Sequence, residues 1–113
     1  MSTVKNLHRQ AMQRADQAHA ARRDGDAAGA RKHFAEAFDL ERRAAQELST
    51  RHDAEPCRSI LFRSAAALAL EAGMSAEAEQ MVRTALAGMP PADIAEALDE
   101  TSRAATQVWG EVA

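Results

Sequence analysis

Apolar residues recur every three or four positions along almost the whole chain, and no stretch alternates between apolar and polar residues as a half-buried β-strand does. Short segments rich in Gly, Pro and Asp interrupt this pattern and divide the chain into stretches of helical length. Because short connections place consecutive helices antiparallel, the pattern predicts an all-α fold of five antiparallel helices. Their expected bounds are about residues 3–23, 26–50, 56–72, 75–87 and 91–109.

The residues at the ends of these segments support the predicted boundaries. Asp26 and Ser75 stand where a side chain can cap the first free N–H groups of a helix. Pro56 suits the first turn of a helix, and Gly73 suits the left-handed residue that follows a helix. The last residues, 110–113, are expected to fray.

The third segment differs from the others because it has almost no polar face. Between Ile60 and Leu70 only Arg63 and Ser64 are polar. A helix that is apolar on all sides is expected to be surrounded by other helices, so this segment is predicted to be central. Most carboxylates, Glu41 among them, are instead expected on solvated helix faces.

Composition agrees with a helical fold and narrows the classes of function. Of the 113 residues 46% are hydrophobic but only 4% are aromatic, and 28 are Ala, which favours helices. The length fits one domain, residues 1–113. Five Gly residues, none spaced as a phosphate-binding loop requires, disfavour most nucleotide-dependent enzymes. The polar first residues, the lack of a long apolar run and the single Cys57 predict a cytoplasmic protein that does not enter a membrane.

A repeated arrangement of small and bulky residues adds a family resemblance. In each copy a turn with Gly precedes a small residue, a bulky residue four positions later and a small residue three positions after that. The copies are Gly25, Ala30, Phe34 and Ala37, then Gly73, Ala78, Val82 and Ala85 with Pro90 beyond. This pattern resembles the second helix of a tetratricopeptide repeat, where small residues allow close helix packing. The resemblance implies two helical hairpins and a C-terminal capping helix.

The two copies depart from a regular array. Phe34 and Val82 are 48 residues apart, whereas the family's period is about 34 residues. In the first segment Arg14, Gln17 and Ala21 stand where the family has Trp, Leu and Tyr. The resemblance is therefore to a degenerate pair of repeats.

The resemblance also implies a function. In such proteins the first helices of successive hairpins line a concave groove that binds extended peptides. Here the groove would carry His19, Arg22, Arg23 and Arg63. Since Arg binds carboxylates through two parallel hydrogen bonds, the expected ligand is another protein or peptide, with an acidic segment or a C-terminal carboxylate. The predicted function is a non-enzymatic protein–protein interaction module, a small adaptor or regulatory protein. Alternatively, Arg22 and Arg23 only complement the helix dipole.

A second class of function remains open on the second segment. Arg31, Lys32, Arg42 and Arg43 lie about three turns apart on one face and could contact nucleic acid. The mildly acidic net charge of −3 and the interspersed carboxylates disfavour this alternative.

An enzyme is a third, less favoured alternative. Cys57 lies near a predicted helix N-terminus, close in sequence to His52, and His19 with His33 could meet across helices. No two histidines are three or four residues apart, so neither a metal nor a cofactor is expected.

Two further expectations concern association. A homodimer could bury Phe38 and Leu48 of the second segment, because two hairpins leave much of their surface uncovered. Trp109 could either join the core or form an exposed anchor at an interface.

Overall fold

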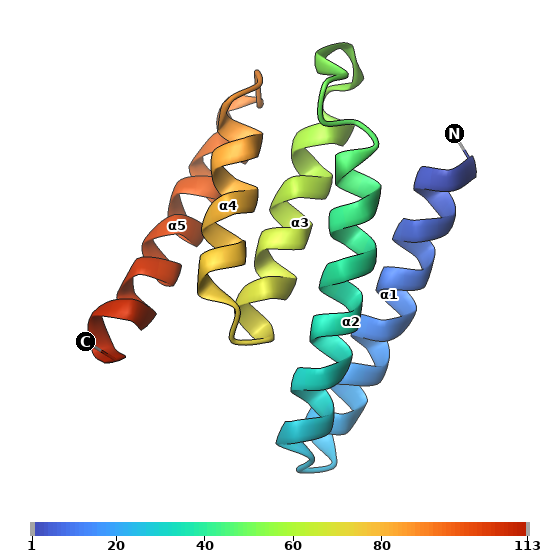
Figure 1. The fold of residues 1–113 in the computed structure, drawn as a ribbon, viewed down its shortest axis with the longest axis vertical. Helices are drawn as coiled ribbons and strands as arrows, with labels where there is room; N and C mark the ends of the chain where they lie inside the picture. The colour runs from blue at the N-terminus through green and yellow to red at the C-terminus, as the bar shows by residue number, and fades with distance from the viewer. Residues whose placement is uncertain (1, 113) are drawn as a thin grey trace.

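The computed structural model describes residues 2–112, and the side chains of residues 3–107. Over that range the chain is all-α and contains no strand. It forms helices α1 (Ser2–Arg23), α2 (Ala27–Gln46), α3 (Cys57–Glu71), α4 (Ser75–Leu86) and α5 (Ala92–Val112), with a short 3-10 helix η1 (His52–Ala54) before α3. The helices run alternately up and down from α1 at one edge to α5 at the other (Figure 1). They make a slab of 42 × 36 × 19 Å. The predicted all-α fold is confirmed, and its likeness to tetratricopeptide repeats stays a prediction.

Two helix ends differ from the sequence prediction. The second helix is expected to reach residue 50, but α2 ends at Gln46, because the next residues tighten into turns in which several N–H groups bond the carbonyl three residues back. Ser49 N donates to Gln46 O, and Arg51 N donates to Leu48 O. At the other end of the chain, α5 continues through Gly110 to Val112 instead of ending near residue 109.

Two hairpins close in the same way. Gly25 and Gly73 take φ values of 80° and 79°, the left-handed conformation that glycine adopts at little cost. Asp26 N then donates to Ala21 O, and Met74 N donates to Ala69 O. These bonds satisfy the last carbonyls of α1 and α3.

The predicted caps are partly correct. Asp26 caps α2, and its Oδ1 accepts a hydrogen bond of 2.8 Å from Gly29 N. Ser75 is not a cap: it is the first residue of α4 and is buried, and the cap position belongs to Met74. Similarly, Pro56 takes the cap position before α3, which begins at Cys57.

Helix α3 lies at the centre of the slab, as its apolar sequence predicts. It contacts α2, α4 and α5, and small residues such as Ala65, Ala66 and Ala69 allow these close approaches. However, α3 is not covered on every side. Ile60, Arg63 and Ala67 are exposed and lie on one side of the helix.

Helices α1 and α2 pack closely against each other and bury a charged residue. Glu41 is 0% exposed, so its predicted place on a solvated face is wrong. His8 on α1 explains the burial, because its Nδ1 lies 2.9 and 3.0 Å from the two carboxylate oxygens of Glu41. Phe38 and Leu48 are also buried within the chain, at 4% and 5% exposed, and so offer no surface to a homodimer.

Candidate functional site

The structure does not gather the four predicted groove residues in one place. Arg22 and His19, near the end of α1, both contact the ring of Phe34 from α2. The Arg22 Cζ atom lies 4.8 Å from the ring centroid, and the His19 ring packs edge-on with its centroid 5.1 Å away. Arg22 also forms an ion pair with Glu71 at the end of α3. It therefore ties the first hairpin to α3.

A hollow of about 230 Å³ lies at this junction, beside the turn between α1 and α2. Arg22, Arg31 and Glu71 supply its charged groups. Because Glu71 already neutralises Arg22, this hollow is a poor receptor for an acidic peptide. Arg23 is exposed on the last turn of α1 and does not line this hollow.

Arg63 lines a different hollow, a groove of about 460 Å³ between α3 and α5. We call it the α3–α5 groove. Two helices form its walls: Arg63, Ser64, Ala67 and Leu70 of α3, and Ala97, Glu100, Thr101 and Ala104 of α5. The alanine side chains on both helices are too short to fill the space between them, which leaves the groove open.

The basic residues predicted for nucleic acid are partly engaged within the chain. Arg42 pairs with Asp39 and donates to Gln46 Oε1 at 3.2 Å. Arg43 lies 4.0 Å from the same Asp39 carboxylate. Arg31 and Lys32 line separate hollows on the two sides of α2. The structure therefore gives no continuous basic surface on this helix.

Among the described residues, those proposed for an enzyme form no hydrogen-bonded set and no metal-binding cluster. Cys57 is exposed, and no hydrogen bond among the described residues joins it to a histidine. His33 pairs with Glu36 on its own helix at 3.0 Å. Within the described residues, no three metal-ligating side chains cluster. The side chain of Trp109 lies outside the described ones.

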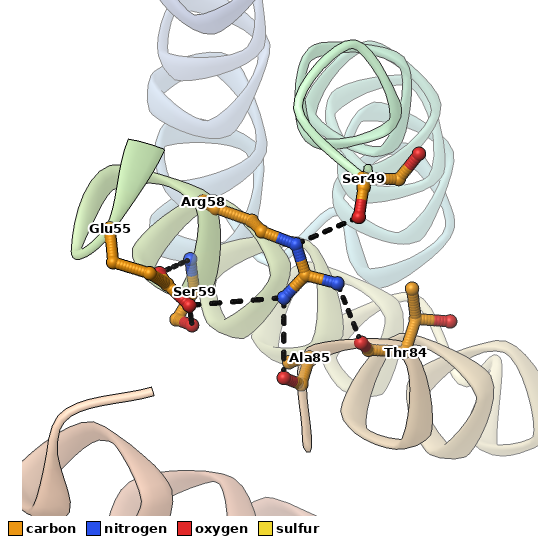
Figure 2. Close-up of polar contacts among 6 residues, drawn as sticks. All are labelled: Ser49, Glu55, Arg58, Ser59, Thr84 and Ala85. Atoms are coloured by element: carbon orange, nitrogen blue, oxygen red, sulfur yellow. Dashed lines mark hydrogen bonds and ion pairs between the residues drawn. The ribbon is translucent and has the colours of Figure 1, made fainter. Parts of the chain in front are cut away.

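The most elaborate polar cluster is one that the sequence analysis did not identify (Figure 2). Arg58, on the first turn of α3, is only 2% exposed. Its Nε donates to Ser49 O at 2.9 Å, its Nη2 to Thr84 O at 2.9 Å and its Nη1 to Ala85 O at 3.3 Å. These carbonyls belong to the turn after α2 and to the last turn of α4. Since a helix C-terminus carries partial negative charge, the guanidinium stabilises the end of α4 and also holds the turn that follows α2.

Neighbouring residues complete the surroundings of Arg58. Glu55 lies 3.9 Å from Arg58 Nη1, and its carboxylate accepts hydrogen bonds from the N–H and hydroxyl of Ser59. The Phe62 ring lies beneath the guanidinium, 5.2 Å from Cζ to centroid. At Gly88, a Cβ atom would lie 2.5 Å from Arg58 Nη1, so glycine leaves the space that the guanidinium occupies. The cluster has a structural role, and it joins α2, α3 and α4.

An exposed ion pair precedes this cluster. Arg51 Nε donates to Asp53 Oδ1 at 3.2 Å. The hydrogen bond and the positive charge of Arg51 lower the pKa of Asp53, and the carboxylate in turn raises the pKa of Arg51.

No protein-family model, curated protein or solved structure matches the chain. Among the described residues, no helix has both the length and the hydrophobicity that crossing a membrane demands.

Proposed function

We propose that the protein is a non-enzymatic protein–protein interaction module, a small cytoplasmic adaptor or regulatory protein. In this proposal the α3–α5 groove receives a segment of the partner protein. The observation that carries it is the uncovered side of α3, the helix that is otherwise the most deeply packed. Ile60 is 41% exposed there, and Arg63 and Ala67 beside the groove are exposed as well.

The arrangement of the helices supports the proposal. In the predicted arrangement α3 is the first helix of the second hairpin and α5 is the capping helix that follows it, and the two helices contact each other directly. The groove between them is large enough for several side chains of a bound segment, and its volume of about 460 Å³ lies in the range typical of binding sites. The short alanine side chains on its walls let a partner's backbone approach closely.

Filling the groove tests the proposal. The double substitution Ala67→Gln and Ala97→Gln adds bulk on both walls without adding charge. The wild-type chain serves as bait in a lysate of the native cell, and the protein that it retains is then titrated against purified variants. We expect at least tenfold weaker binding by the double variant, with unchanged helicity by circular dichroism.

Ala76→Gln is the matched control, because Ala76 is an exposed residue of α4 that does not line the groove. The control should bind as the wild type does. Equal binding by the wild type, the control and the groove-filled variant would exclude the groove, and retention of no protein would contradict the interaction module itself.

A further inference from the structure

Charge is divided unevenly along the chain. Residues 1–51 carry ten Lys or Arg and seven Asp or Glu, a net charge of +3. Residues 52–113 carry four Lys or Arg and ten Asp or Glu, a net charge of −6. Helices α1 and α2 belong to the basic part, and α3, α4 and α5 belong to the acidic part. The α3–α5 groove therefore lies in the acidic half of the molecule.

Carboxylates also follow the groove itself. Glu100 lines it, and Asp93 and Glu96 lie on the same side of α5, three or four residues apart. All three are exposed, and none forms an ion pair with a described side chain. Arg63 is the cation on the opposite wall, and Arg103 lies one turn beyond Glu100.

The basic residues of α1 and α2 do not offset these carboxylates. Arg22 lies next to α3 but is paired there with Glu71. At physiological ionic strength salt screens the interaction between exposed charges over about 8 Å. Cations at the far edge of the slab therefore contribute little to the electrostatic potential at the groove. The groove and its α5 wall thus present a net negative charge to an approaching partner.

We propose that the segment bound in the α3–α5 groove is basic, with Lys or Arg side chains that pair with Asp93, Glu96 and Glu100. This inference rests on the proposed function and differs from the acidic ligand that the sequence suggests. Complementary charge would speed association and make the affinity depend on salt. Small side chains of the segment would pack between the alanine-lined walls.

A library of random peptides tests the charge of the bound segment directly. Random dodecapeptides displayed on phage are selected on the full chain and counter-selected on the Ala67→Gln, Ala97→Gln variant. We expect the enriched peptides to be net positive. Their affinity, measured by fluorescence anisotropy, should be at least tenfold weaker for the double variant Glu96→Lys, Glu100→Lys. Their affinity for the wild-type chain should also fall as the salt concentration rises.

The control variant Asp16→Lys, Glu47→Lys changes the net charge equally, at an exposed acidic residue of α1 and at the exposed acidic residue that follows α2. It should bind the enriched peptides within about twofold of the wild type. Enrichment of acidic or neutral peptides would overturn the basic partner and leave the groove's function standing. No enrichment over the groove-filled variant would contradict both proposals. If the wild-type chain self-associates with rising concentration and the double variant Glu96→Lys, Glu100→Lys does not, the groove binds a second copy of the chain. That result would overturn the inference of a basic partner segment.

Discussion

Arg58 and Arg63 lie five residues apart on the same apolar helix, yet their environments are opposite. Arg58 is 2% exposed and donates to three backbone carbonyls, one in the turn after α2 and two in the last turn of α4. Arg63 is exposed on the wall of the α3–α5 groove and pairs with no described carboxylate. Five residues turn a helix by about 140° beyond a full circle, which carries the side chain from the packed side of α3 to its open side.

The difference shows what burial of a guanidinium requires. A charged group leaves water only where hydrogen bonds replace its hydration. Arg58 finds carbonyls, the Glu55 carboxylate and an aromatic ring within reach, and Gly88 leaves it the necessary space. Arg63 has none of these partners among the described groups, so its guanidinium stays exposed to water.

The largest expected effect is a difference in the free energy of unfolding between variants of the two arginines. Arg58→Met removes the donor from carbonyls at the ends of α2 and α4, and we expect a loss of about 3 kcal/mol in the free energy of unfolding. Arg63→Met should change it by less than about 0.5 kcal/mol, as is usual for an exposed side chain. Urea denaturation followed by circular dichroism measures both. Equal losses for the two variants would contradict the structural role of Arg58.

A smaller effect tests the space that Arg58 occupies. In Gly88→Ala the new methyl group would lie 2.5 Å from Nη1, so the guanidinium must shift, and we expect a loss of about 1–2 kcal/mol. In an Arg58→Met background this loss should nearly disappear, because the crowded atom is absent.

Gly73→Ala provides the control for this cycle. Nothing lies within 4 Å of its added Cβ, and its φ of +79° strains any side chain, so the loss of about 1 kcal/mol should be the same in both backgrounds. Additive losses for Gly88→Ala and Arg58→Met would show that the two residues do not interact.

The sequence pattern predicts the helices better than it predicts the buried charges. Periodicity and turn residues place all five helices within a few residues of their bounds. Arg58 and Glu41, however, occupy positions on the apolar stripes of their helices, with Phe62 on α3 and Phe38 on α2. A charged residue on such a stripe is itself a signal of a buried polar cluster. Its partners cannot be predicted in the same way, because His8 and the carbonyls that Arg58 binds come from separate helices.

The candidate groove shows a second limit of the pattern. Helical spacing puts Arg63 and Ala67, four residues apart, on one side of α3, but it does not determine which helix forms the opposite wall. The sequence suggests α1, whereas the groove forms with α5, and Arg22 turns instead to Phe34 and Glu71. Long, flexible side chains can reach several neighbours, and only the packed arrangement of the helices selects one.

The smallest expected effect concerns a third arginine, Arg51. Like Arg63 it is exposed, but like Arg58 it has a partner, the carboxylate of Asp53. Because Arg51 lowers the pKa of Asp53 below its ordinary value of 3.8, the folded state binds this proton less readily than the unfolded state does. The pair therefore stabilises the fold at pH values above 3.8, the ordinary pKa of an Asp side chain. This stabilisation is lost as the pH falls through the lower pKa that Asp53 has in the folded state. Asp53→Asn should have a slightly lower urea midpoint than the wild type at neutral pH, and the difference should vanish in acid and shrink in high salt, since both side chains are in water. A difference that grows on acidification would show that Arg51 does not stabilise the Asp53 carboxylate.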